Sequence, residues 1–154
     1  MRSVEIVRYQ RRLQSLLRQA SVMPDNVELQ SHWARYLCIL TSAFLELALR
    51  ELYGHYARQR SAPFVANYVE RNLGYVQNPS MDRILTLAGS FSPEWASKLK
   101  DQTEGELKDA VDSVVANRNR IAHGEDVGIT YARVADYYRR VVRVIEIVEE
   151  QCSL

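Results

Sequence analysis

Apolar residues recur along this chain at spacings of three and four, the repeat of α-helices that bury one face. The repeat is clearest over residues 26–60, where one stripe consists of Trp33, Leu37, Leu40, Phe44 and Leu47. Four further apolar residues (Leu45, Ala48, Leu49 and Leu52) widen that stripe. We therefore expect a long central helix with neighbours on several sides.

Three other long helices are predicted around it. One covers residues 4–19 and ends before Pro24 and Asp25, which break it and offer a cap for the next helix. Another follows the stretch 103–106, where Thr103 and Glu106 fit a capping box, and ends at Gly124. The last covers residues 130–151. Its valines favour a strand, but its charged residues repeat at helical spacing and outweigh them.

Proline and glycine divide the middle of the chain into shorter pieces. We predict short helices over residues 64–72, 80–88 and 93–100. Asn78-Pro79 and Ser92-Pro93 each place a capping residue before a proline, which suits a helix start. The expected fold is all-α: a compact antiparallel bundle of four main helices with short inserted helices, forming a single domain over residues 1–154.

Composition narrows the possible functions. A net charge of +1 does not by itself indicate a nucleic-acid partner, so a basic site must come from local clustering. One such cluster, which either binds RNA or is a solvated helix face, consists of Arg8, Arg11, Arg12 and Arg18. The two cysteines form no C-x-x-C unit, and no metal site or cofactor is expected. Without a long apolar run or signal peptide, we expect a cytoplasmic protein that does not enter the membrane.

The residues with chemical potential lie at the end of the predicted helix after residue 106. The apolar stripe of Leu107, Val111 and Val114 continues at its own spacing to Arg118. An unpaired buried charge is costly, so Arg118 must meet a partner charge or face a cleft.

His123 follows Arg118 by five positions, which on an ideal helix places the two side chains about 140° apart. They converge only if the helix unwinds or ends between them. A histidine that exchanges a proton near neutrality, beside a fixed cation, suits phosphodiester chemistry. The plainer alternative is that His123 caps the helix and Arg118 forms a structural salt bridge with Glu46.

The run Arg118-Asn119-Arg120-Ile121-Ala122-His123 resembles the Arg-x4-His signature of the HEPN superfamily, including its polar residue after the arginine. The match fits the bacterial toxin and defence branch, of which RiboL-PSP-HEPN proteins are an example. The resemblance implies a metal-independent endoribonuclease that leaves 2′,3′-cyclic phosphate and 5′-hydroxyl ends. It also implies a homodimer in which two motifs form one composite active site, with a possible antitoxin as partner.

The resemblance also implies roles for the residues. His123 would act as general acid or base, Arg118 would bind the scissile phosphate, and Asn119 would orient His123 or the phosphate. The apolar surface around Arg118, with Val114 and Ile121, would be the dimer interface. Arg120 is a further RNA-binding candidate. Some HEPN toxins carry a modified tyrosine two residues after the histidine, and here that residue is Glu125, which weakens regulation by that route.

Two questions stay open from sequence. Glu46 either pairs with Arg50 one turn later or supports Arg118 and His123 as a second layer of the site. The whole chain is either the ribonuclease or a HEPN-like helical module that binds a nucleotide or a protein without cleaving. A purely structural dimerisation bundle is a third reading, and it would leave His123 buried and fully hydrogen-bonded.

Overall fold

The computed structural model describes residues 3–24 and 26–153, and within them it contains seven helices and no strand. In chain order they are α1 (Val4–Ser21), α2 (Val27–Arg60), α3 (Pro63–Leu73), α4 (Met81–Phe91), α5 (Pro93–Thr103), α6 (Glu106–Ala122) and α7 (Tyr131–Cys152). The predicted all-helical class is confirmed. Three of the helices have 11 residues each, and the other four have 17 to 34.

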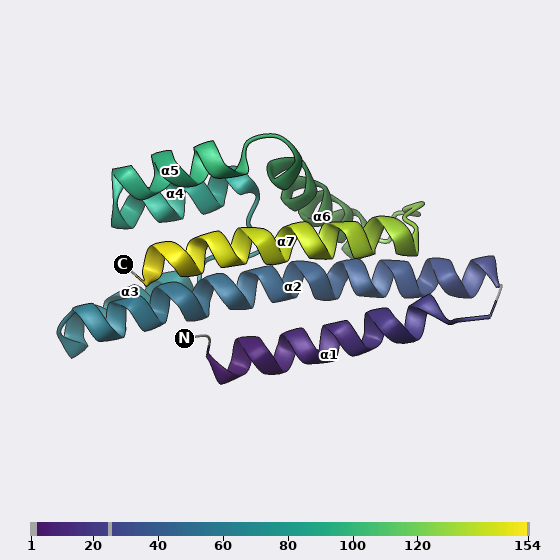
Figure 1. Ribbon diagram of the computed structural model, residues 1–154, viewed down its shortest axis with the longest axis horizontal. Helices are drawn as coiled ribbons and strands as arrows, with labels where there is room; N and C mark the ends of the chain where they lie inside the picture. The colour runs from purple at the N-terminus through teal and green to yellow at the C-terminus, as the bar shows by residue number, and fades with distance from the viewer. Residues whose placement is uncertain (1–2, 25, 154) are drawn as a thin grey trace.

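Helix α2 runs through the centre of the bundle, with α1 and α7 lying along it on two sides (Figure 1). Its Phe44 shows why the apolar stripe had to be wide. The Phe44 ring stacks on Tyr9 of α1 at 5.7 Å and also meets Tyr138 of α7 at 6.4 Å between ring centroids. One side chain of α2 therefore joins three helices, as its predicted central place requires.

The middle of the chain folds into α3, which packs on α2, and a hairpin of α4 and α5 (Figure 1). Ser92 is the N-cap of α5 with Pro93 in its first turn, as predicted. The corresponding prediction for Asn78-Pro79 is wrong, because α4 begins at Met81 with Ser80 as its N-cap. Asn78 instead adopts a φ of 45°, which bends the chain away from helical geometry before α4 starts.

The predicted capping box at 103–106 is also wrong. Helix α5 continues to Thr103, whose hydroxyl donates a 2.7 Å hydrogen bond to the carbonyl oxygen of Leu99 in its own helix. The N-cap of α6 is Gly105, with a φ of 91° and no side-chain cap. The chain therefore turns sharply at a glycine, and the threonine closes the earlier helix rather than opening the later one.

The start of α2 uses Asn26, whose side chain accepts a hydrogen bond from the backbone nitrogen of Leu29. The predicted cap region at Pro24 and Asp25 therefore precedes the observed N-cap, and Asp25 lies outside the described residues. Over the described ranges, no helix combines the length and apolar character that crossing a membrane requires.

Candidate active site at the end of helix α6

Helix α6 stays helical through Ala122 and ends at the predicted place, with His123 as its C-cap. Gly124 has a φ of 77°, and its backbone nitrogen donates to the carbonyl oxygen of Ile121 at 3.0 Å. The backbone nitrogen of Glu125 donates to the carbonyl oxygen of Arg120 at 3.0 Å. These two bonds form a Schellman motif, which fixes where the chain leaves the helix immediately after His123.

An ion pair reinforces this ending. Nε of Arg120 lies 2.8 Å from Oε2 of Glu125, so the side chains bridge the same two residues that the backbone bond joins. Both side chains are more than half exposed, which limits what the pair contributes to stability. Arg120, predicted as an RNA contact, thus has a carboxylate partner within the single chain.

Arg118 is half-buried and faces α2. It lines a hollow of about 310 Å³ whose other walls are Ile39, Ala43, Glu46, Leu47, Arg50 and Asn78. Nη1 of Arg118 donates a 3.4 Å hydrogen bond to Oδ1 of Asn119, and no ion pair involves Arg118 within residues 3–24 and 26–153. The sequence predicted that Arg118 would either meet a partner charge or face a cleft, and within the chain it faces a cleft.

Glu46 shares the hollow with Arg118 but is committed elsewhere. Its Oε1 lies 2.9 Å from Nη2 of Arg50, and its Oε2 accepts a 2.8 Å hydrogen bond from the backbone nitrogen of Asn78. The alternative of an Arg118–Glu46 salt bridge is therefore wrong, and the pairing of Glu46 with Arg50 is confirmed.

Arg50 extends this arrangement to the segment between α3 and α4. Its Nε and Nη2 donate to the carbonyl oxygen of Val76 at 3.2 and 2.6 Å, and Nη2 also donates to that of Gly74 at 3.2 Å. Together, Glu46 and Arg50 hold residues 74–78 against α2. The part of the hollow that Asn78 lines is therefore fixed by charge-assisted hydrogen bonds.

His123 is exposed and is not among the residues that line this hollow. Because α6 does not unwind before it, the expected rotation of about 140° from Arg118 persists. Asn119 lies between them around the helix, one position after Arg118 and four before His123. One chain thus places the arginine and the histidine at the same helix end but not in the same pocket. A purely structural bundle would leave His123 buried, whereas this side chain is exposed.

The apolar surface beside Arg118 comes from α2 and not from α6, the helix that carries Arg118. Val114 is fully buried, and its carbonyl oxygen lies 3.7 Å from Sγ of Cys38, so its expected place in an interface is wrong. The partly exposed apolar neighbours of Arg118 are Ile39, Ala43 and Leu47 of α2. Their spacing of four in the sequence was the available signal.

The arginines of α1 lie apart from this site. Arg8 pairs with Glu5 at 3.2 Å, and Arg11 and Arg12 are exposed. Helix α1 makes no contact with α6, and the two lie on opposite sides of α2 in Figure 1. A role for these arginines in RNA binding stays a prediction.

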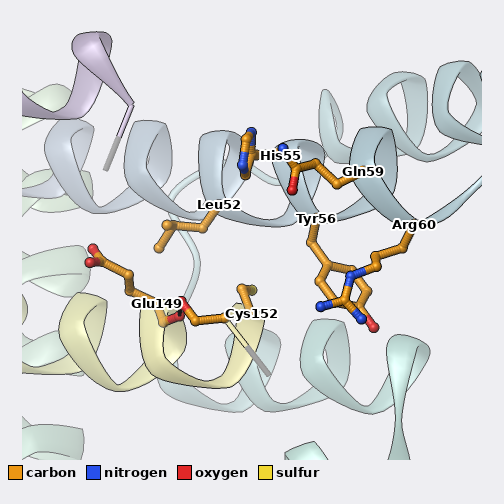
Figure 2. Close-up of a pocket in the computed structure, with 8 residues that line it drawn as sticks. Leu52, His55, Tyr56, Gln59, Arg60, Glu149 and Cys152 are labelled. Atoms are coloured by element: carbon orange, nitrogen blue, oxygen red, sulfur yellow. Dashed lines mark hydrogen bonds between the residues drawn. The ribbon is translucent and has the colours of Figure 1, made fainter. Parts of the chain in front are cut away.

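A second pocket, of about 220 Å³, lies between the carboxyl ends of α2 and α7 (Figure 2). Cζ of Arg60 lies 5.4 Å from the ring centroid of Tyr56, and His55 and Cys152 also line the pocket. Burial, together with the charge of Glu149, raises the pKa of the Cys152 thiol to about 12, which keeps it protonated and unreactive at neutral pH. This pocket holds none of the motif residues. Across the described ranges, no three His, Cys, Asp or Glu side chains are grouped to hold a metal ion.

Comparison with known families agrees with the motif. The family model described as RiboL-PSP-HEPN matches residues 5–154, nearly the whole chain and all of the helices described above except the first residue of α1. No curated protein and no solved structure gives a significant match.

Proposed function

The chain belongs to the RiboL-PSP-HEPN family, and from that premise we propose that it is a metal-independent endoribonuclease. The observation that carries the proposal is the state of Arg118. A half-buried guanidinium that faces a hollow, with no carboxylate partner in the described chain, is suited to bind an anion from outside. A phosphodiester is an anion on which a histidine such as His123 can act as general acid or base.

The proposed reaction needs no group beyond the RNA and the protein. The 2′-oxygen attacks the neighbouring phosphorus, and the bond from phosphorus to the 5′-oxygen breaks, leaving a 2′,3′-cyclic phosphate and a 5′-hydroxyl. One His123 takes the proton of the 2′-hydroxyl, and a second His123 gives a proton to the departing 5′-oxygen. Arg118 stabilises the charge that develops on the phosphate, and Asn119 holds Arg118 in place.

Two histidines require two chains, so we propose a homodimer with a composite active site. The exposure of His123 at the outer end of α6 leaves it accessible to a second copy. The partly exposed Ile39, Ala43 and Leu47 supply an apolar surface beside Arg118 for that contact. Dimerisation there brings each Arg118 toward the His123 of the partner, which the single chain keeps apart.

For the biological setting we propose a cytoplasmic toxin or defence effector, controlled by an antitoxin protein. This follows the branch of the family to which the chain belongs. Regulation by modification of a tyrosine two residues after the histidine does not apply, because Glu125 occupies that position and pairs with Arg120.

The test is cleavage of mixed RNA in EDTA by the wild type, His123→Ala and Arg118→Ala. Matched controls are His55→Ala and Arg139→Ala, which remove an exposed histidine and an exposed arginine elsewhere. We expect cleavage by the wild type and both controls, with cyclic phosphate ends, and a loss of at least 100-fold in each motif variant. RNA carrying 2′-deoxy or 2′-O-methyl groups should resist cleavage.

Failure of the wild type to cleave, while folded and dimeric, would favour a non-catalytic module that binds RNA, a nucleotide or a protein. Cleavage that survives both motif substitutions would place the active site elsewhere in the chain.

A further inference from the structure

The outer face of α3 carries large side chains that the bundle does not cover. Phe64 is 88% exposed, Tyr68 is 70% exposed, and Tyr75, just after the helix, is 72% exposed. Phe64, Tyr68 and Arg71 lie within an arc of about 60° on an ideal helix. The opposite face holds Ala66 and Leu73, which are buried. The aromatic residues therefore lie on the side that needs no apolar side chain for packing.

This face is basic rather than acidic. The acidic residue of α3, Glu70, is paired with Arg58 of α2. Arg71 is exposed and takes part in no ion pair within the described parts of the chain. Two rings and one free guanidinium on this face, with the exposed ring of Tyr75 just after the helix, favour an anionic partner with flat groups, because rings and guanidinium planes both stack on nucleobases.

The chain connects the end of α3 to the hollow of Arg118 through residues 74–78. Tyr75 stands between Gly74 and Val76, whose carbonyl oxygens Arg50 holds, so its backbone is fixed while its ring is exposed. Asn78, three residues later, lines the hollow together with Arg118. Three residues of chain span at most about 11 Å. The backbone of Tyr75 therefore lies within about 11 Å of Asn78, a residue that lines the candidate phosphate site.

We propose that the outer face of α3, defined by Phe64, Tyr68, Arg71 and Tyr75, is a stacking platform for single-stranded RNA. Unstacked bases lie on the three rings, Arg71 contacts the backbone, and the strand continues to Arg118. Paired bases cannot present their faces to side chains in this way, so the platform selects unpaired segments of the substrate. The inference rests on the proposed function for its choice of RNA as ligand.

Binding is measured apart from cleavage, by fluorescence anisotropy with a labelled 12-nucleotide RNA that is fully 2′-O-methylated and unpaired. We expect Phe64→Ala, Tyr68→Ala and Tyr75→Ala each to weaken binding roughly tenfold, and Tyr68→Trp to retain it. Arg71→Ala should weaken binding and reduce its salt dependence, whereas the control Arg139→Ala, at another exposed arginine, should not. A hairpin with the same bases paired should bind the wild type more weakly than the unpaired strand.

Cleavage gives a second readout. The aromatic substitutions should lower kcat/KM for an unmodified 12-nucleotide strand but leave cleavage of a dinucleotide unchanged, because a dinucleotide does not reach α3. If the aromatic variants bind the modified strand as tightly as the wild type does, the platform is wrong and the ribonuclease proposal stands. If ring-dependent binding occurs without any cleavage, the platform stands and the ribonuclease proposal fails.

Two other results would overturn the platform. One is the absence of any binding to the modified strand by the folded wild type. The other is a change from dimer to monomer in Phe64→Ala or Tyr68→Ala, measured by light scattering, which would make this face a contact between copies of the chain.

Discussion

Arg118 and Asn119, adjacent residues at the end of α6, are joined by a 3.4 Å hydrogen bond from Nη1 of the arginine to Oδ1 of the asparagine. Asn119→Ala removes this restraint without removing the charge, so we expect kcat/KM for RNA cleavage to fall about tenfold. Asn119→Asp should be worse, because a carboxylate would pair with the guanidinium and compete with the phosphate. Steady-state cleavage by both variants tests this, and an Asp variant as active as wild type would contradict it.

The ending of α6 gives a prediction that links backbone conformation to activity. Gly124 has a φ of 77°, and a Cβ there would meet no atom within 4 Å, so Gly124→Ala is strained through its backbone alone. We expect a loss of about 1 kcal/mol in the free energy of unfolding. Gly124→Asn should lose less, because asparagine tolerates this conformation. Urea unfolding measures both.

Cleavage by the two Gly124 variants is compared at a temperature where each is fully folded. A drop in kcat for the alanine variant beyond that of the asparagine variant would show that the Schellman motif positions His123.

The contacts by which Glu46 holds the segment before α4 should contribute to the stability of the fold. Glu46→Ala leaves Arg50 without its carboxylate partner and the backbone nitrogen of Asn78 without its acceptor, so we expect a loss of about 1–2 kcal/mol. Glu46→Gln keeps an acceptor oxygen and should lose less. Urea midpoints of both variants test this, and equal losses would mean that the charge rather than the hydrogen bond matters.

Dimer formation should depend on the apolar surface of α2 beside Arg118 and not on Val114. Ala43→Arg or Leu47→Asp places charge on the exposed wall beside Arg118, and we expect folded monomers that no longer cleave RNA. Val114→Asp should instead unfold the protein, because that side chain is fully buried. Light scattering and circular dichroism separate the two outcomes, with Val4→Asp as an exposed control.

Alkaline pH should destabilise the fold through Cys38. Burial raises the pKa of this thiol from 9.0 to about 12 in the folded chain. The folded state therefore keeps a proton that the unfolded state releases, so stability is full below pH 9 and declines between pH 9 and 12. The slope for one thiol is at most about 1.4 kcal/mol per pH unit. Unfolding of the wild type and Cys38→Ala at pH 7.5 and 10 should show a smaller decline in the variant.

Prediction from sequence worked where one helix face or one cap decided the outcome. The stripe through Phe44 identified α2 as central, and Gly124 identified the end of α6. Prediction failed where one side chain could form either of two local hydrogen bonds. Thr103 fits a capping box in sequence, but its hydroxyl is satisfied by Leu99 because α5 runs on to meet it. How far a short helix extends depends on packing that a local pattern does not contain.

In the candidate site, too, the sequence predicted some features and missed others. The motif identified Arg118, Asn119 and His123 as neighbours in sequence, and the helix geometry separated the arginine from the histidine. The walls of the hollow come from α2 and from the segment before α4, far from the motif along the chain. The segment before α4 is held in place by tertiary contacts of Glu46 and Arg50. The sequence allowed Glu46 either to pair with Arg50 or to support the motif residues, and it gave no sign that Arg50 would also bind this segment.

The uninterrupted course of α2 sets a rule for how chains of this kind can vary in length. This one helix presents Ile39 to the hollow and further along packs against α3. Inserting a single residue between those points would turn everything beyond it by about 100° and shift it by about 1.5 Å. The aromatic face of α3 and the hollow would then lose their present relative orientation. Natural insertions and deletions should therefore gather at joints such as Gly105 and be rare within α2.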